Sequence, residues 1–167
     1  MSRIHLVLGP VGAGKSTFGQ RLAFEHGAVR LTLDDWFAPL FSPDRPPGDA
    51  RAWYMERVER VLARIEQVAD DVLDVGKDVV LEVGLIRRAQ RDAFFARRDE
   101  ERHGLVIYEL NAPRDIRRER VARRNAERGA TWAMEVPPAV FELASDLWEP
   151  LADDERAGRD VRDVTTG

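Results

Sequence analysis

The chain has 167 residues, a formal net charge of −4 at pH 7 and no cysteine. This length suits a single domain, and a hydrophobic content of 44% is enough for a core, which argues against disorder. The lack of cysteine excludes disulfide scaffolds, cysteine-ligated metal centres and thiol nucleophiles. No apolar run approaches the roughly 20 residues of a membrane span, and the first ten residues do not form a secretory signal. We therefore expect a soluble, cytoplasmic protein with no membrane partner and no general attraction for nucleic acid.

Strands and helices are predicted to alternate along the chain. Apolar runs predict buried strands at 4–8, 29–33, 78–83 and 105–110. Helical periodicity, together with glycine and proline at the borders, predicts helices at 15–26, 50–75, 89–102, 113–128 and 137–147. A proline-rich loop is expected at 38–49, and 156–167 is either an edge strand or a flexible tail. Because such strands pair in parallel, we expect an α/β three-layer sandwich around a mainly parallel sheet of four or five strands.

A phosphate-binding loop is the most specific signal in the sequence. Residues 9–16 read Gly-Pro-Val-Gly-Ala-Gly-Lys-Ser and match the pattern G-x-x-x-x-G-K-[ST], for which chance predicts roughly 0.0005 matches in this composition. Glycines let backbone N–H groups face phosphate oxygens, the lysine approaches the β- and γ-phosphates, and the serine hydroxyl can bind Mg²⁺. We therefore expect ATP and Mg²⁺ as cofactors. The expected nucleotide-binding residues are Gly9, Pro10, Val11, Gly12, Ala13, Gly14, Lys15, Ser16 and Thr17.

Four segments together resemble the small P-loop kinase group: the phosphate loop, Leu31–Asp35, Val79–Gly84 and Arg124–Gly129. This group includes polynucleotide 5′-kinases, chloramphenicol phosphotransferase, zeta toxins and many proteins described only as AAA family ATPases. The resemblance implies the P-loop NTPase form of the sandwich, with one kinase domain over 1–155 and a helical lid at about 113–136. GTPases match less well, because neither lysine lies in the base-reading pattern N-K-x-D.

The acceptor side of the predicted site follows the second strand. In the kinase group, the aspartate at this position lies near the hydroxyl that accepts the phosphoryl group, which implies a catalytic role for Asp34 and substrate contacts for Asp35 and Trp36. A carboxylate there can accept the hydroxyl proton and orient the oxygen. The alternative is that one aspartate only caps the next turn. Polynucleotide kinases carry an arginine where this chain has Phe37, so the aromatic residues form either the wall of a small-molecule site or part of the core.

Glu82 follows three apolar strand residues, where a charge is costly to bury unless it is paired or used. The resemblance implies that Glu82 contacts a magnesium-bound water or the acceptor, so that Ser16 and Glu82 form the metal site. The alternative for Glu82 is a salt bridge to Arg87 or Arg88. Arg88 is also a candidate substrate contact, or else part of a solvated helix face.

Seven arginines lie between residues 114 and 128. The resemblance implies that a lid arginine stabilises charge on the transferred phosphoryl group and closes the site from water. Arg124 and Arg128 match this position best and are the predicted catalytic arginines. Arg120 lies one turn before Arg124 and shares its helix face. The remaining arginines are expected to be solvated or ion-paired.

These residues together favour an ATP- and Mg²⁺-dependent kinase that transfers the γ-phosphoryl group to a hydroxyl of a small molecule, with Lys15 as its catalytic lysine. A polynucleotide 5′-hydroxyl kinase is one alternative, and a nucleotide-binding switch or ATPase is another. The acceptor and the oligomeric state stay open. The three histidines, His5, His26 and His103, are scattered along the chain and fit no metal-ligand spacing.

Overall fold

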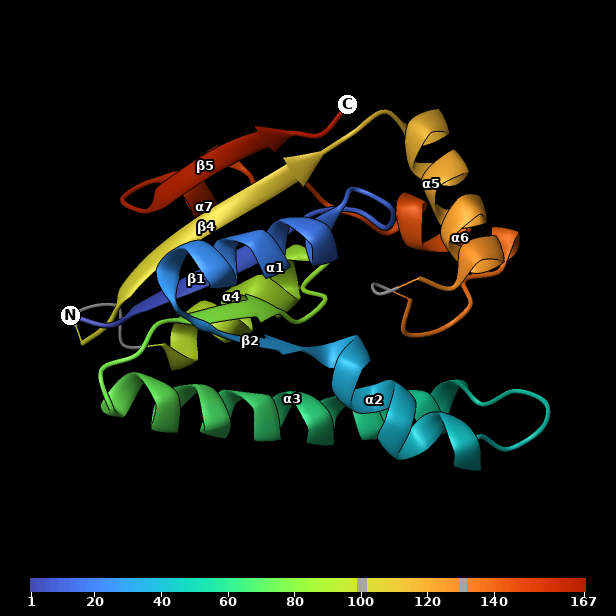
Figure 1. Cartoon of the computed structure of the whole chain (residues 1–167), viewed down its shortest axis with the longest axis horizontal. Coiled ribbons are helices and arrows are strands. Elements are labelled where there is room, and N and C mark those ends of the chain that lie inside the picture. Colours follow the sequence, from blue (N-terminus) through green and yellow to red (C-terminus); the bar gives the residue numbers. More distant parts are fainter. Residues whose placement is uncertain (99–101, 130–131) are drawn as a thin grey trace.

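The computed structural model describes residues 1–98, 102–129 and 132–167. Five strands of this part form one parallel sheet in the order β2-β3-β1-β4-β5 (Figure 1). The strands are β1 Arg3–Leu8, β2 Val29–Thr32, β3 Val79–Glu82, β4 Gly104–Asn111 and β5 Asp160–Thr165. The predicted α/β fold with a parallel sheet is confirmed. The last strand pairs with β4, so residues 160–165 form a sheet edge and not a flexible tail.

Helices connect the strands at nearly the predicted positions. They are α1 Lys15–His26, α2 Leu33–Phe41, α3 Arg51–Asp74, α4 Arg88–Arg97, α5 Arg114–Glu127, α6 Pro138–Asp146 and α7 Asp153–Arg156, with a 3-10 turn, η1, at Ser42–Asp44. Helix α4 ends at Arg97, before the predicted end at residue 102, and residues 99–101 lie outside the described part of the chain. The predicted lid contains α5, and its residues 130–131 also lie outside the described part.

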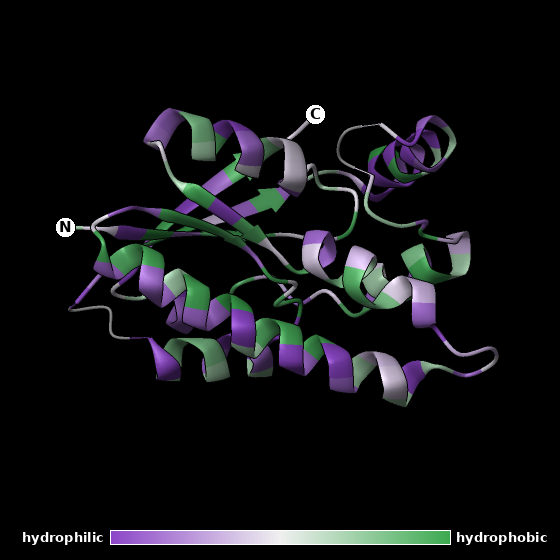
Figure 2. Cartoon of the chain, turned by 60° about the horizontal axis from the view of Figure 1, so that its bottom comes forward, coloured by the Kyte–Doolittle hydropathy of each residue, from purple (hydrophilic) through white to green (hydrophobic). Residues whose placement is uncertain are grey.

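Helices cover both faces of the sheet, which forms the middle layer. Helix α1 packs on one face, where Leu22 joins the cluster around Val7. Helices α3 and α4 pack on the opposite face, where Ile65 and Phe94 join the cluster around Leu6. Because neighbouring residues of β1 point to opposite faces, both must be apolar, and this explains the continuous apolar run. Figure 2 shows the hydrophobic colour concentrated on the strands and on the sheet-facing sides of the helices.

Helix α2 replaces the predicted end of the second strand and the first part of the predicted loop. The strand ends at Thr32, whose hydroxyl accepts a hydrogen bond from the Asp35 backbone N–H and caps the helix. The helix continues through Pro39 and buries Phe37, whose ring lies 6.2 Å from that of Trp53 in α3. Burial of this aromatic surface outweighs the loss of one backbone hydrogen bond at the proline.

The strand order brings the predicted functional segments to one end of the sheet. In Figure 1 the strands run toward the end where α5 and α6 lie. The phosphate loop follows β1 at the centre of the sheet, Glu82 ends β3, and Asp34 lies in the turn after β2. In open parallel sheets, ligands bind at the carboxyl ends of the strands, so this end carries the candidate site.

Candidate active site

The phosphate loop between β1 and α1 is held by close backbone packing. Its three glycines, Gly9, Gly12 and Gly14, all have positive φ angles. A Cβ atom on Gly12 would lie 2.6 Å from the carbonyl oxygen of Arg117, and one on Gly9 would lie 2.7 Å from that of Leu110. Only glycine fits such contacts, so packing against α5 and β4 fixes the loop as tightly as its own backbone does.

Lys15 begins α1 and folds back over the loop. Its Nζ donates hydrogen bonds to the carbonyl oxygens of Gly9, at 2.8 Å, and Pro10, at 2.9 Å. Burial lowers the pKa of Lys15 below its ordinary value, while the negative charges of Glu82 and Asp34 oppose the shift. No side chain caps α1, so the first-turn N–H groups have no side-chain partner there. An anion at this helix end would meet both the ammonium group and these N–H donors.

Glu82 lies at the centre of a chain of polar contacts that the sequence did not predict in full. The hydroxyl of Ser16 donates a hydrogen bond to Glu82 Oε1 at 2.8 Å, so the two predicted metal ligands lie next to each other. Arg30, on β2, donates to Glu82 Oε2 at 3.1 Å and to Asp35 Oδ2 at 2.9 Å. The salt-bridge partner of Glu82 is therefore Arg30, and the predicted alternative partners, Arg87 and Arg88, were wrong. The sequence signal for Arg30 was a charged residue inside a short apolar strand.

Asp34 occupies the first turn of α2, beside the phosphate loop. Burial raises the pKa of Asp34, and the negative charge of Glu82 raises it further, while Lys15 and Arg124 act in the opposite direction. The residue as a whole is exposed. We therefore infer a carboxylate beside the phosphate loop that is more basic than an ordinary aspartate.

The arginines of α5 fall into groups with different surroundings. Arg124 is close enough to influence the pKa of both Lys15 and Asp34, and its buried Nε has no hydrogen-bond partner among the described residues. Arg128, after the helix, stacks over Trp132 at 5.1 Å. Of the two predicted catalytic arginines, Arg124 therefore faces the phosphate loop, and Arg128 faces a neighbouring cleft.

Two further arginines of α5 support the phosphate loop from behind. Arg117 donates to the carbonyl oxygens of Val11, at 3.0 Å, and Ala112, at 3.1 Å. Arg120 donates to Thr166 Oγ1 at 3.0 Å, and that hydroxyl donates to Ala13 O at 2.7 Å. Arg120 thus acts through the C-terminal end of the chain. No local pattern could have predicted either role, because Val11 and Thr166 are distant in the chain from these arginines.

An open cleft of about 620 Å³ lies beside α2, and Asp35, the neighbour of Asp34 in the chain, lines it. Helix α2 lines one side with Asp35, Ala38, Pro39 and Ser42, and the segment after α5 lines the other with Arg128, Trp132, Ala133, Met134 and Glu135. Its volume falls within the range of small-molecule sites. Its charged lining contains two carboxylates and one arginine, which suits an uncharged polar molecule better than a polyanion.

Two predicted substrate residues have other surroundings. Arg88 binds Asp154 through both terminal guanidinium nitrogens, at 3.1 and 2.5 Å, and its backbone N–H donates to Glu149. Trp36 is partly buried against the large core cluster, and Phe37 belongs to that cluster. These contacts do not bring Arg88 to the cleft, and they assign Phe37 to the core.

The donor set fits Mg²⁺. Ser16 offers a hydroxyl oxygen, Glu82 offers a carboxylate 2.8 Å away, and Asp34 is close enough for its charge to interact with that of Glu82. Hard oxygen donors of this kind are the ligands that Mg²⁺ prefers.

Among the described residues, no helix is both long enough and apolar enough to cross a membrane.

Comparison with known proteins gives the same assignment. The family model described as an AAA domain matches residues 4–151. The shikimate kinase of Psychrobacter arcticus is 33% identical over 127 residues, and the match covers 70% of this chain and 58% of that protein. The chain thus spans less than two thirds of this curated relative.

Solved structures share the fold. A candidate kinase from Chloroflexus aurantiacus has a TM-score of 0.72 at 20% identity, with 98% of this chain and 88% of that chain covered. A sugar kinase from Janibacter sp. HTCC2649 has a TM-score of 0.61 at 19% identity, with 99% and 86% covered. The chain belongs to the AAA domain family, and the predicted resemblance to the small P-loop kinase group is confirmed.

Proposed function

We propose that this protein is a P-loop phosphotransferase that transfers the γ-phosphoryl group of ATP to a hydroxyl of a small molecule. The observation that carries this proposal is one constellation at the carboxyl ends of the strands. It combines Lys15 on the phosphate loop, the pair of Ser16 and Glu82 at 2.8 Å, and the basic carboxylate of Asp34, whose neighbour Asp35 lines an open cleft. A nucleotide switch needs only the lysine of the phosphate loop and the Ser16–Glu82 pair. A transferase also needs a carboxylate near the acceptor hydroxyl and a cleft for the acceptor.

The donor side binds the triphosphate. The uncapped first turn of α1 and the Lys15 ammonium would bind the β- and γ-phosphates, so Lys15 would exchange its contacts with Gly9 and Pro10 for phosphate oxygens. Ser16 and Glu82 would hold Mg²⁺, which neutralises phosphate charge when bound. Arg124, with its unpartnered Nε, would contribute positive charge toward the transferred group.

The acceptor side provides the base. The acceptor oxygen attacks the γ-phosphorus, the bond from that phosphorus to the β–γ bridging oxygen breaks, and ADP leaves with the bond electrons. The hydroxyl proton passes to Asp34. A raised pKa makes its carboxylate a stronger base than an ordinary aspartate, which favours this transfer. Asp35 is held by Arg30 at 2.9 Å, so it is less free than Asp34 to accept the proton.

The lining of the cleft favours a small hydroxyl compound as the acceptor. Sugars and related polyols match a volume of about 620 Å³ and a lining of mixed polar and apolar side chains. The relatives described as shikimate kinase and sugar kinase act on small molecules according to their names. A polynucleotide would place phosphates beside Asp35 and Glu135, where like charges repel.

The test is ATP turnover with Mg²⁺ across a panel of sugars, hydroxy acids, nucleosides, aminoglycosides, chloramphenicol and 5′-hydroxyl oligonucleotides. One small acceptor is expected to raise turnover and to gain one phosphate by mass spectrometry. Lys15→Ala is expected to lower kcat at least about a hundredfold. Lys77→Ala is the matched control, because Lys77 is the other lysine of the chain and is exposed. A gain of phosphate only on oligonucleotides, or on no acceptor, would overturn the proposal.

A further inference from the structure

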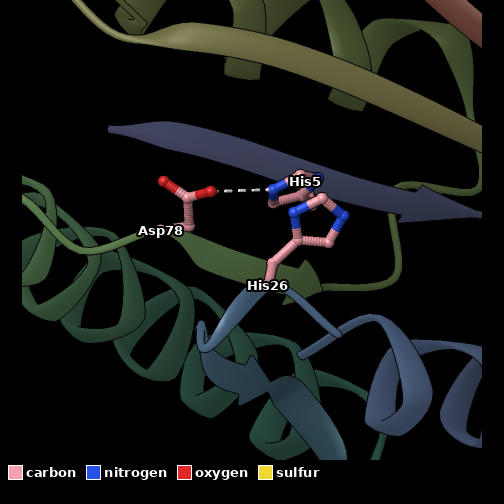
Figure 3. A group of neighbouring side chains, drawn as sticks. All are labelled: His5, His26 and Asp78. Atoms are coloured by element: carbon pink, nitrogen blue, oxygen red, sulfur yellow. Dashed lines mark hydrogen bonds and ion pairs between the residues drawn. The ribbon is translucent and has the colours of Figure 1, made fainter. Parts of the chain in front are cut away.

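A second group of metal-ligating side chains lies away from the phosphate loop. His5 on β1, His26 at the end of α1 and Asp78 just before β3 each offer a ligand atom, and these atoms all lie within 4.8 Å of one another. Figure 3 shows the two imidazole rings side by side, with the carboxylate directed toward His5. In the sequence the three histidines fit no metal-ligand spacing, and it is strand pairing that brings His5 close to Asp78, which is distant in the chain.

The distances match those between ligands of one metal ion. His5 Nε2 lies 3.2 Å from Asp78 Oδ2. Two ligands held about 2.0–2.2 Å from a tetrahedral zinc ion lie about 3.3–3.6 Å apart. The ring centroids of His5 and His26 are 4.4 Å apart, so His26 needs only to turn its side chain to complete the set. His26 is exposed and free to do so.

The surroundings orient the ligands in the way that metal sites require. His5 is 1% exposed, and its other ring nitrogen, Nδ1, lies 3.3 Å from the hydroxyl of Tyr108. Asp78 Oδ1 accepts a hydrogen bond from the Arg3 backbone N–H at 2.8 Å, which leaves Oδ2 to face the histidines. Such outer partners fix the ring and the carboxylate and are typical of metal ligands. His26 forms no hydrogen bond with any described residue.

We propose that His5, His26 and Asp78 form a binding site for a divalent transition metal ion, with zinc as the best match. Two neutral imidazoles and one carboxylate are a ligand set suited to zinc, and the exposed side of His26 leaves a position for water. The ion would tie β1, α1 and β3 together at the end of α1 opposite Lys15. The two ends of this helix are roughly 16 Å apart, so the site is separate from the phosphate loop.

The test is calorimetric titration of the untagged chain with Zn²⁺, in excess Mg²⁺ so that the oxygen ligands of the phosphate loop are occupied. One zinc ion per chain is expected to bind in the micromolar range or tighter. His26→Ala and Asp78→Asn are each expected to weaken binding at least about tenfold, since loss of even an outer partner costs 10–100-fold. His103→Ala, which removes the histidine outside the group, is the matched control and is expected to bind as the wild type does.

Two further measurements separate metal binding from folding defects. Co²⁺ is expected to give visible absorption bands of tetrahedral intensity with the wild type and to lose them with His26→Ala, while the far-ultraviolet circular dichroism of the two proteins stays the same. Zinc is also expected to raise the Tm of the wild type and not that of His26→Ala. Absence of micromolar zinc binding, or full binding by His26→Ala, would show that the group is only a histidine–aspartate contact and would overturn the proposal.

Discussion

Replacement of Gly12 by alanine tests whether α5 fixes the shape of the phosphate loop. Gly12 has φ of +80°, and its Cβ would lie 2.6 Å from Arg117 O and 3.0 Å from Arg117 Cβ. The left-handed conformation costs alanine about 1–2 kcal/mol. The contact adds an overpacking cost of about 1–3 kcal/mol, because Arg117 is held by hydrogen bonds to Val11 and Ala112 and cannot easily withdraw. The expected loss is about 2–5 kcal/mol of unfolding free energy, or a displaced loop.

Two other glycines separate these contributions. Gly27 has φ of +58° with no atom within 4 Å of its Cβ position, and Gly14 has φ of +89° with only Thr166 nearby, at 3.9 Å. Alanine at either site meets the conformational cost without the clash. Urea denaturation is expected to place Gly12→Ala about 1–3 kcal/mol below both controls at unchanged m-value. If the loop moves in place of this loss, ATP affinity falls in Gly12→Ala and stays unchanged in Gly27→Ala, which lies outside the loop. Equal stability and equal affinity in Gly12→Ala and Gly27→Ala would refute the reasoning.

Three further changes test the proposed roles. Asp34→Asn is expected to lower kcat at least about a hundredfold. In the wild type, kcat is expected to fall as the pH is lowered, and the fall begins at a pH above the ordinary aspartate pKa, because the pKa of Asp34 is raised and only the ionised carboxylate accepts a proton. A rate–pH profile checks this, and a flat profile contradicts it. Glu82→Gln keeps an acceptor for the Ser16 hydroxyl but loses the charge, so the Mg²⁺ needed for half-maximal turnover is expected to rise about 10–100-fold in a titration. Arg117→Ala is expected to cost about 1.5–3 kcal/mol in urea denaturation and to weaken ATP binding, whereas Arg118→Ala, on the exposed side of the same helix, stays near the wild type.

The parts of the fold predicted correctly are those with local signals. One stretch of fewer than 15 consecutive residues contains β1, the glycines of the phosphate loop and the start of α1. The sequence motif there therefore predicts the backbone conformation directly. Helix α2 was not predicted, because the local sequence indicates a loop and the contacts that stabilise the helix come from another part of the chain. Pro39 suggested a loop, while the reason for the helix is burial of Phe37 against Trp53 and Tyr54, which belong to a later helix. Local propensity therefore lost to tertiary packing.

Charged residues in the interior lay beyond sequence prediction for a related reason. Arg91, on α4, is 0% exposed and binds Glu155 at 2.7 and 3.0 Å. A buried arginine is stable only when its partner is present, and this partner lies on α7, far along the chain. The same holds for Arg30, whose two acceptors, Asp35 and Glu82, follow different strands. Such pairs become visible only when the sheet order is known.

The contacts of α5 differ between the two halves of the helix. Arg114 and Arg118 bind Glu142 of α6, and Arg117 binds the phosphate loop, so the first half of the helix is part of the scaffold. Beyond Arg120, the buried Nε of Arg124 has no hydrogen-bond partner within the described part of the chain.

The second half of α5 is instead hydrogen-bonded to the segment that follows the helix. The Asn125 side chain donates to Val136 O at 2.8 Å and accepts from the Val136 N–H at 3.2 Å, which clips the end of the lid segment to the helix. A displacement of this half would therefore carry Arg124, Arg128 and one wall of the cleft together. Closure over nucleotide and closure over acceptor would then be a single motion, which allows water to be excluded only when both substrates are bound.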